Sequence, residues 1–574
     1  MTVNMKKTAL TASFVILIML FLSCNAAPIL KFRILGLDKD LLKSVTAQLQ
    51  LKQETIVMPD DSSVIAFYRE APQEISKVLK LQGYFKSTVV AGTTTHKKNK
   101  WESTFKVNLG PSLKIVAIDL RVLGNGAADE KIRQRLQSFP LKKGEIFRTD
   151  RYNAAKKFLF NLADAYGYAN AFLVVKKVLI DLEKNTAAII LHLDTGPQYY
   201  FGSTNFTVPF FSKVFLAKFL PYKLGDVYST EKLSALHDVL NNSNFFQQIT
   251  INPQIDKNKA HEIPIEVVLI PRKAKQYNVG VGFSTDSGLR GSLGMEWRYL
   301  TPNAHSFKGE VRGSQVQQDL ELHYLIPGKY PVTDLYDFNL ASKTINLNSN
   351  RSLTIEAGAS YTTVLKGWRQ TIKLSLQHEH HQLVSKPYAS SVLLIPSINW
   401  SNSKSDDPIK PTNGRSINLA LRGANKYLMA KNSFFQAQTD TKYIKMLSPK
   451  IQMVLRAALG FTVVDDVNNL PLALQFYTGG TQSIRGFGYN VIGPGRNFMV
   501  GSAELRHQII GDWYVATFFD AGNANNDLFK KLNRGVGAGI VLRTIIGTLE
   551  LTYAKALSLP GTPGKIQFSL GPEL

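Results

Sequence analysis

Hydrophobic and polar residues alternate, segment after segment, over the second half of the chain from Gln276 onward. Alternation with a period of two places apolar side chains on one face of a β-strand and polar side chains on the other. The clearest apolar rows are Tyr277, Val279, Val281 and Phe283; Leu289, Leu293, Met295, Trp297 and Tyr299; Leu320, Leu322, Tyr324 and Ile326; and Leu353, Ile355, Ala357, Ala359 and Tyr361. About sixteen such segments can be counted. This even number predicts a transmembrane β-barrel of antiparallel strands over residues 276–574, with a soluble β-sandwich as the alternative.

The first half of the chain repeats a pattern that mixes strand-like and helix-like segments. Gly110-Pro111 recurs as Gly196-Pro197, and the segment 143–147 recurs as 224–228. Each repeat reads as strand, helix, helix, strand, strand, which predicts a small α+β domain. For the second repeat we expect strands at 115–122, 171–177 and 186–194 and helices at 128–137 and 151–166. The expected repeats cover residues 27–111, 112–197 and 198–275.

The N-terminus has the order of residues that is typical of a secretory signal. Lys6 and Lys7 precede an apolar run, residues 9–22, which is followed by Cys24 and Ala26. We expect a signal peptide over residues 1–26 with cleavage after Ala26; lipidation at Cys24 is the alternative. Cys24 is the only cysteine, so the mature chain would have no disulfide framework. Past residue 26 no apolar run reaches eighteen residues, so an integral form has to be a closed barrel.

The chain carries a formal net charge of +25, from 68 Lys and Arg against 43 Asp and Glu. Such an excess often indicates nucleic-acid binding. The basic residues are spread along the chain and form no compact motif with aromatic residues, and export argues against that partner. Anionic lipid head groups or an acidic partner in the cell envelope fit this charge better; a solvated basic surface with no specific partner is equally open.

A long polar connection, residues 462–497, interrupts the strand pattern and holds the segment 476–489. This segment is rich in glycine and contains Ile484, Arg485, Gly486 and Phe487. Glycine allows positive φ and tight folding, so the sequence predicts a hairpin that presents one arginine. Counting strands in pairs makes this connection the sixth surface-side loop, between the eleventh and twelfth strands.

In this setting the segment resembles the conserved lumen-plugging loop of the bacterial outer-membrane assembly and secretion factors. BamA, TamA and the two-partner secretion transporters form that superfamily. The stretch from Phe518 to Gly522 likewise resembles the Phe-x-Asp-x-Gly element that meets the loop arginine inside such barrels. Strand parity independently turns Phe518, Asp520 and Glu504 toward the lumen. We therefore expect an Arg485–Asp520 ion pair with Glu504 nearby; a solvated loop arginine is the alternative.

The resemblance is strongest to the TamA (translocation and assembly module) branch. The segments 547–557 and 568–574 look like its last two strands, and three N-terminal repeats, which resemble POTRA (polypeptide-transport-associated) domains, match its number. In this family the first and last strands meet at a weak lateral seam, here 276–284 and 565–571. The residues expected at the seam are Val279, Gly280, Gly282, Phe568 and Gly571, with Val279 and Phe568 as the pair to crosslink.

The resemblance implies a function without covalent chemistry. The repeats receive an unfolded outer-membrane client protein, and a client strand pairs with an opened edge of the seam. The implied location is the outer membrane of a Gram-negative bacterium, with the repeats in the periplasm. The implied partners are clients such as autotransporters, a TamB-like inner-membrane protein and outer-membrane lipids, and no cofactor, metal or nucleic acid is implied. Small sheets with free edges suit pairing with an extended client, although the repeats could also act only as spacers.

Other functions receive little support from the sequence. The run His378-Glu379-His380-His381 could bind a metal, but we expect it in a polar connection with no metal role. No phosphate-binding loop follows a strand and no nucleophile elbow is present, so an enzyme is not expected. A two-partner secretion transporter and a passive porin-like channel stay open as alternatives.

Overall fold

The computed structural model describes residues 29–55, 61–97, 100–255, 261–347, 350–382, 389–427, 433–467, 470–527, 531–545 and 547–571. The expected signal segment with Cys24 and Ala26 lies outside the described residues. The chain forms two compact units: the first holds repeats one and two and part of repeat three, and the second holds the rest of repeat three and the barrel. Within these residue ranges, no helix is both long and apolar enough to cross a membrane.

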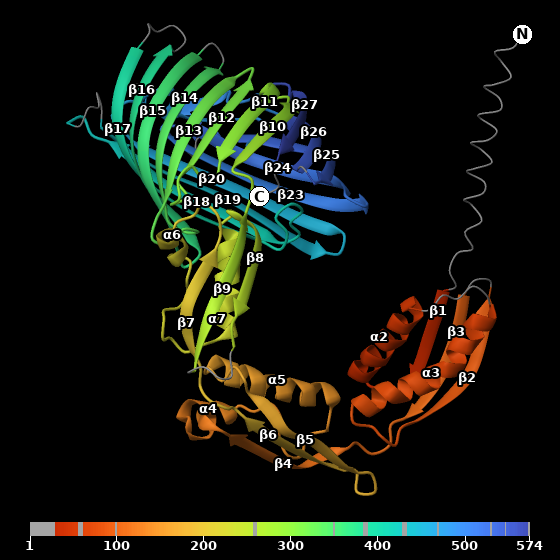
Figure 1. The fold of residues 1–574 in the computed structure, drawn as a ribbon. Helices are drawn as coiled ribbons and strands as arrows, with labels where there is room; N and C mark the ends of the chain where they lie inside the picture. Colours follow the sequence, from red (N-terminus) through yellow and green to blue (C-terminus); the bar gives the residue numbers. More distant parts are fainter. Residues whose placement is uncertain are drawn as a thin grey trace, which may run out of the picture. The chain divides into compact units, whose positions relative to one another are not determined.

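The first repeat is a three-stranded sheet covered by two helices (Figure 1). Its elements are β1 (Ile29–Leu35), α2 (Lys39–Thr55), α3 (Asp61–Leu81), β2 (Thr88–Lys97) and β3 (Lys100–Asn108). The strand order is β1-β3-β2, with β1 parallel and β2 antiparallel to β3. Tyr68 of α3 lies in the core, where its hydroxyl donates to the Trp101 carbonyl at 3.1 Å, and burial raises the pKa of Tyr68 to about 12.

The second repeat has the same arrangement, with strand order β4-β6-β5. Its elements are β4 (Lys114–Leu123), the 3-10 helix η1 (Asn125–Ala128), α4 (Glu130–Leu136), α5 (Thr149–Ala165), β5 (Phe172–Asp181) and β6 (Thr186–Asp194). These elements overlap all five predicted segments. The α4 helix begins later than expected because the Asp129 side chain accepts from the Lys131 N–H at 2.9 Å, which is the usual chemistry of a helix N-cap. Leu159 of α5 and Leu191 of β6 are fully buried in its core.

The third repeat consists of β7 (Tyr200–Thr207), α6 (Lys213–Ala217), α7 (Thr230–Asn242), β8 (Phe246–Pro253) and β9 (Glu262–Pro271), with strand order β7-β9-β8. The predicted boundaries at 111 and 197 fall in connections between strands, and the boundary at 275 falls on the first residue of the barrel. Phenylalanines near α6 pack against the barrel: the ring centroids of Phe211 and Tyr299 are 5.0 Å apart. Ser212 also donates its N–H to the Pro302 carbonyl at 2.9 Å, so this part of the repeat is fixed to the barrel.

The barrel is a single sheet of sixteen strands within the described residues, in the order of the sequence, which confirms the predicted number and fold class. Every neighbouring pair from the first strand to the last is antiparallel. The strands are β10 (Lys275–Ser284), β11 (Gly288–Trp297), β12 (Ser306–Ser314), β13 (Gln317–Pro327), β14 (Leu335–Leu347), β15 (Asn350–Leu365), β16 (Trp368–Gln382), β17 (Ala389–Ser405), β18 (Gly414–Ala424), β19 (Phe434–Ser448), β20 (Ile451–Val463), β23 (Asn497–Ile510), β24 (Trp513–Asn525), β25 (Asn533–Thr544), β26 (Gly547–Ala556) and β27 (Gly564–Gly571).

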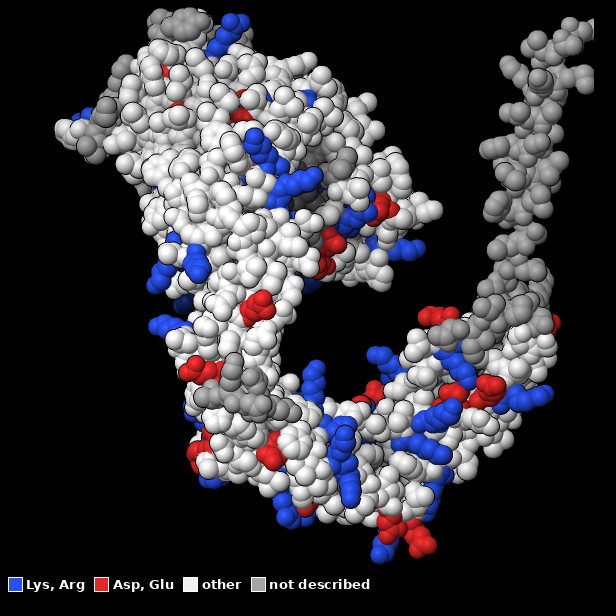
Figure 2. All heavy atoms as spheres, viewed as in Figure 1, with Lys and Arg blue, Asp and Glu red and all other residues white. Residues whose placement is uncertain are grey.

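The predicted alternation sorts side chains between the two faces of the barrel wall. Val279, Val281 and Leu289 point outward and are 76%, 82% and 68% exposed, which suits a wall that faces lipid. In β24, by contrast, exposed and buried residues alternate strictly from Trp513 to Asp520, and the buried ones face the lumen. On the face drawn in Figure 2, charged side chains are sparse over the barrel strands and numerous on the N-terminal repeats.

Connections at the end of the barrel where β10 begins are called repeat-side turns, and those at the other end surface-side loops. The longest surface-side loop, residues 464–496, joins β20 to β23, the eleventh and twelfth strands, and is called loop 6. It contains the 3-10 helix η3 (Leu472–Leu474) and a small two-stranded sheet of β21 (Phe476–Thr478) and β22 (Ile492–Gly495). The sixth position of this loop agrees with the strand count made from the sequence.

Candidate functional site in the barrel lumen

Arg485 lies inside the barrel and is only 1% exposed, although it belongs to a surface-side loop. Its guanidinium binds Asp520 of β24 through two bonds, Nε to Oδ2 at 2.8 Å and Nη2 to Oδ1 at 2.9 Å. The Arg485 backbone N–H donates to the same Oδ2 at 3.0 Å. A third side-chain bond joins Nη1 to Glu504 Oε2 at 2.5 Å. Two parallel bonds to one carboxylate fix both the position and the orientation of the loop arginine.

The wall around the guanidinium extends this network. The guanidinium lies over the Phe518 ring, with 3.4 Å from the guanidinium carbon to the ring centroid, a favourable cation–π arrangement. Arg506 donates to Glu504 at 2.5 Å and to Glu550 of β26 at 2.8 Å. Arg485 and Arg506 are thus matched by three carboxylates, those of Asp520, Glu504 and Glu550. A buried charge requires such compensation, because an unpaired one is costly in a medium of low dielectric constant.

The residues beside Arg485 fit the loop tightly against the wall. Ile484 and Phe487 are buried in one apolar cluster with Phe476 and Phe498. Gly486 has φ +92° and lies against the backbone of β26, where an added Cβ would come within 3.0 Å of the Ala556 nitrogen. The wall contributes Gly535, where a Cβ would lie 2.1 Å from the Arg485 carbonyl oxygen. Glycine at both positions is therefore what allows this approach of two backbones.

Gly522, which the sequence placed in the loop-anchoring wall, has other neighbours. A Cβ at Gly522 would meet the Met499 carbonyl at 2.3 Å, so this glycine permits the close pairing of β23 and β24. Loop 6 does not supply the contact that requires it.

The first half of loop 6 is bound to the opposite side of the lumen. Glu379 of β16 is fully buried and accepts from the Leu472 N–H and from the Ser352 hydroxyl, both at 2.8 Å. Gln436 of β19 donates to the Leu474 carbonyl at 2.9 Å. These anchors were not identified from the sequence, although parity along β19 would have turned Gln436 inward.

The expected polar connection at His378–His381 is wrong, because these residues lie inside β16. Glu379 and His381 face the lumen and His380 faces outward, since neighbouring residues of a strand point to opposite faces. The four side chains therefore do not converge on one ion. Among the described residues, no group of three or more His, Cys, Asp or Glu could hold a metal.

The seam between β10 and β27 differs from all other strand junctions of the barrel. Within the described residues these two strands share no register of paired residues. Hydrogen bonds of the described residues span the junction near the surface-side end of β10: the Thr285 N–H, just after β10, donates to the Phe568 carbonyl at 3.2 Å, and Arg290 Nη2 of β11 donates to the Leu570 carbonyl at 3.0 Å. The Phe283 and Phe568 rings lie beside each other with centroids 6.1 Å apart.

This geometry corrects the seam positions expected from the sequence. Phe568 lies at the seam, but its neighbours are Phe283 and Thr285 rather than Val279. Because β10 and β27 run in opposite directions and meet at the surface-side end of β10, Val279 is about 14 Å along the strand from Phe283. Gly280 and Gly282 lie opposite Ser292 and Arg290 of β11, and Gly571 has no neighbour within 4 Å of an added Cβ.

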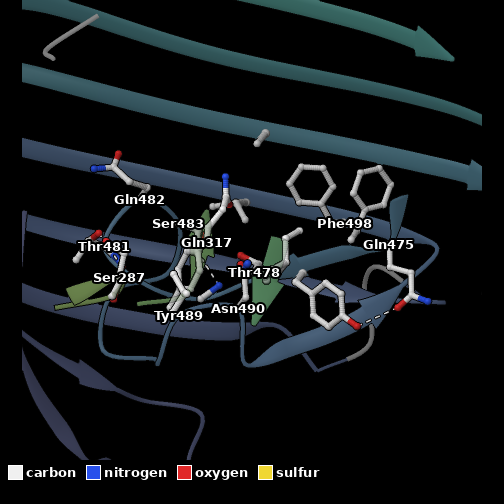
Figure 3. Close-up of a pocket in the computed structure, with 18 of the residues that line it drawn as sticks. Ser287, Gln317, Gln475, Thr478, Thr481, Gln482, Ser483, Tyr489, Asn490 and Phe498 are labelled. Carbon is white, nitrogen blue, oxygen red and sulfur yellow. Dashed lines mark hydrogen bonds between the residues drawn. The ribbon is translucent and has the colours of Figure 1, made fainter. Parts of the chain in front are cut away.

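Loop 6 contacts both sides of this seam. On the β27 side, Gln567 Oε1 accepts from the Gly486 N–H at 2.8 Å, and Gln567 Nε2 donates to the Phe487 carbonyl at 3.3 Å. On the β10 side, Asp286 accepts from the N–H and the hydroxyl of Thr481 at 2.6 and 2.7 Å. Figure 3 shows Thr481 close to Ser287, the neighbour of Asp286 in the first surface-side loop. The same loop that holds Arg485 thus connects the two edges of the seam.

A cavity of about 570 Å³ remains beside loop 6. Loop 6 contributes Gln482 and Tyr489 to its lining (Figure 3) as well as Tyr477, and further lining residues come from β13, β14 and β19. Loop 6 therefore occupies part of the lumen and leaves a cavity with both polar and apolar lining next to it.

A sixteen-stranded barrel, preceded by small α+β repeats and carrying an arginine loop folded into its lumen, defines a class of outer-membrane protein. The family model of the Omp85 superfamily domain matches residues 277–573, and the model of POTRA domain TamA domain 1 matches residues 31–109. The chain belongs to the Omp85 superfamily.

Two relatives show how far the similarity reaches. The outer membrane protein assembly factor BamA of Neisseria meningitidis serogroup B is 18% identical over 458 residues, which are 74% of this chain and 56% of that protein. The chain thus spans little more than half the length of this curated relative. The crystal structure of BamA from Haemophilus ducreyi lacking POTRA domains 1–3 has a TM-score of 0.69 at 18% identity and covers 80% of this chain and 99% of that one. This likeness establishes the fold of the barrel.

Replacing Arg485 by alanine should lower the free energy of unfolding by about 3 to 5 kcal/mol, because Asp520 and Glu504 would be left buried with too little positive charge. The double variant R485M/D520N should be less destabilised than R485M alone, since Glu504 keeps Arg506. The urea concentration at which the folded band disappears from unheated SDS gels measures this difference.

The exposed Arg534 of β25 provides the matched control, and Arg534→Ala should leave the urea midpoint unchanged. Equal midpoints for Arg485→Ala and Arg534→Ala would show that the buried ion pairs do not stabilise the fold.

Removing either contact at the seam should loosen its edges. Gln567→Ala and Asp286→Ala each delete hydrogen bonds to loop 6, and a loss of about 1.4 kcal/mol corresponds to a tenfold increase in local opening. Hydrogen exchange of the amides in 275–284 and 564–571 should be faster in both variants. Asp286→Asn keeps an acceptor oxygen, so its amides in these two segments should exchange at the rate of the unmodified protein. Unchanged exchange in the two alanine variants would contradict the claim that loop 6 connects the two edges of the seam.

Proposed function

We propose that this protein is an outer-membrane assembly factor of the TamA branch, which inserts client β-barrel proteins such as autotransporters. The observation that carries the proposal is the seam, where the described residues of β10 and β27 share no paired register and are joined by backbone hydrogen bonding near Thr285 and Phe568. Edge strands in lipid are costly, because each unsatisfied backbone group costs several kcal/mol there. A client strand that pairs with β10 satisfies these groups, so the edge is a template for β-augmentation.

The N-terminal repeats support a route by which clients reach the seam. Each repeat has a three-stranded sheet with two outer strands, and the outer strand β5 exposes Phe172, Val174 and Leu179 at 55%, 51% and 57%. Apolar side chains on an open edge suit binding of an extended chain. The match of the first repeat to the TamA model favours this branch, and with it a TamB-like inner-membrane partner.

The proposed location is the outer membrane of a Gram-negative bacterium. The exposed apolar rows of the barrel would face its lipids, and the repeats, with the repeat-side turns, would lie in the periplasm. The positive net charge of the chain suits anionic head groups at that surface. The insertion step itself needs no cofactor, since backbone pairing at the seam supplies the free energy.

Opening of the seam is expected to be required for client insertion. Cysteines in place of Phe283 and Phe568, in a chain whose Cys24 is replaced by serine, should form a crosslink and block insertion of an autotransporter barrel into proteoliposomes. Reduction of the crosslink should restore insertion. The pair V279C/F568C is the matched control, because it should neither crosslink nor block. Full activity of the crosslinked F283C/F568C protein would exclude the seam as the client route.

The passive channel is distinguished by conductance. An assembly factor whose lumen is occupied by loop 6 should show small, fluctuating currents in planar bilayers, whereas a porin should show a large, steady pore. Arg485→Ala should increase the current, because it releases the loop from the lumen wall. A large, steady current in the unmodified protein would favour the porin.

A further inference from the structure

The repeat-side turn between β17 and β18, residues 406–413, has a fixed shape of its own. The Asp406 N–H donates to the Asn413 carbonyl at 3.0 Å and closes the base of the turn. The Asp406 carboxylate accepts from the N–H groups of Thr412 at 2.9 Å and Asn413 at 3.0 Å. Burial disfavours the charge on Asp406, but these hydrogen bonds outweigh it and hold the pKa of that carboxyl well below its usual range.

The tip of this turn is bound to distant strands. Pro411 is buried while residues 406–409 are exposed or nearly so. The Pro411 carbonyl accepts from Gln452 Nε2 of β20 at 3.1 Å and from Arg543 Nη2 of β25 at 3.0 Å. Lys410 also forms an ion pair at 2.5 Å with Asp512, in the turn between β23 and β24. Gln452 and Arg543 are both buried on the lumen side of the wall.

These partners require the turn to cross the part of the lumen between the ninth and the fourteenth strands. Its own strands are the eighth and ninth, whereas β20 and β25 are the eleventh and fourteenth. Five steps between neighbouring strands from the ninth to the fourteenth amount to roughly 24 Å along the wall. Pro411 is three residues before Gly414, the first residue of β18, and so lies within about 11 Å of it. The turn therefore extends over the opening directly, and the Arg543 side chain meets it from the far side.

We propose that the 406–413 turn closes the repeat-side mouth of the lumen and forms a second barrier to small solutes, in series with loop 6. The two barriers rest on different residues: loop 6 is held by Asp520 and Glu504, and the turn is held by Gln452, Arg543 and Asp512. The barrier that the 406–413 turn forms affects only the passage of small solutes through the lumen. It does not depend on whether the protein inserts clients as proposed. With this turn in place, a movement of loop 6 alone leaves the lumen constricted at its repeat-side mouth.

Conductance in planar bilayers tests the series arrangement. In the Arg485→Ala background, residues 407–412 are replaced by Asn-Gly, which makes a two-residue hairpin turn between Asp406 and Asn413. The conductance should rise at least about threefold over Arg485→Ala alone, because the second constriction is removed. The short turn alone should raise it less, since loop 6 still blocks the lumen. Equal conductance of Arg485→Ala with and without the native turn would overturn the proposal.

Ile409→Ala in the same background is the control, because Ile409 belongs to the same turn and is 49% exposed, so its loss should leave the conductance unchanged. Heat-dependent mobility on SDS gels verifies that each barrel is folded.

A second measurement covers the case in which Arg485→Ala does not fold. In otherwise unmodified protein with Cys24 replaced by serine, the pair K410C/D512C should be bridged by a short bis-maleimide reagent with retention of client insertion. Absence of the bridge in a folded barrel would overturn the proposed closure. A bridged barrel that no longer inserts clients would leave the closure intact and contradict the seam as the client route, so the two failures are distinguishable.

Discussion

A guanidinium group that is buried away from solvent must be neutralised by protein groups that are already in place. Arg485 is surrounded by two carboxylates, a serine hydroxyl and an aromatic face. In a medium of low dielectric constant, such a pair is not a large net source of stability, because both partners lose their hydration. The ion pair instead selects one placement of loop 6. Any other placement that keeps Arg485 away from Asp520 leaves buried charges without a partner. The loop is therefore bound in one position.

Arg485 also explains how the seam is coupled to the lumen. The two residues after the arginine, Gly486 and Phe487, form hydrogen bonds with the Gln567 side chain of the last strand: the Gly486 N–H donates to it and the Phe487 carbonyl accepts from it. Thr481, four residues before it, binds Asp286 beside the first strand. A loop held at its centre by an ion pair can thus connect two strand edges that share few bonds with each other. Sliding of β10 against β27 would have to break contacts with the loop, so the ion pair in the lumen contributes to the resistance of the seam.

The sequence predicted the structure correctly where the alternation of a strand decides on which face a side chain lies. Strand parity placed Asp520 and Glu504 in the lumen, and the same reasoning applied to Gln567 and Glu550 would have found two more members of the site. The sequence paired Val279 with Phe568 wrongly. Strand parity says which face of the wall a residue occupies, but it does not say how far β10 and β27, which are far apart in the sequence, are shifted along each other. His378–His381 was assigned to a connection because its residues are polar on both faces, although Glu379 has buried partners. The path of the 406–413 turn depends on distances across the barrel lumen, which no local sequence pattern contains.

Under the proposed function, the closures by loop 6 and by the 406–413 turn at opposite ends of the lumen bear on the path of a client chain. A polypeptide that moved through the lumen would have to displace loop 6 from Asp520 and also break the Pro411 and Lys410 contacts. The desolvated charges and carbonyls exposed in doing so would each require new partners. At the seam, by contrast, few hydrogen bonds between β10 and β27 have to be exchanged, and an incoming strand replaces them with a full set of backbone bonds. The free-energy difference between these two routes therefore favours lateral pairing over passage through the lumen, since only lateral pairing forms more bonds than it breaks.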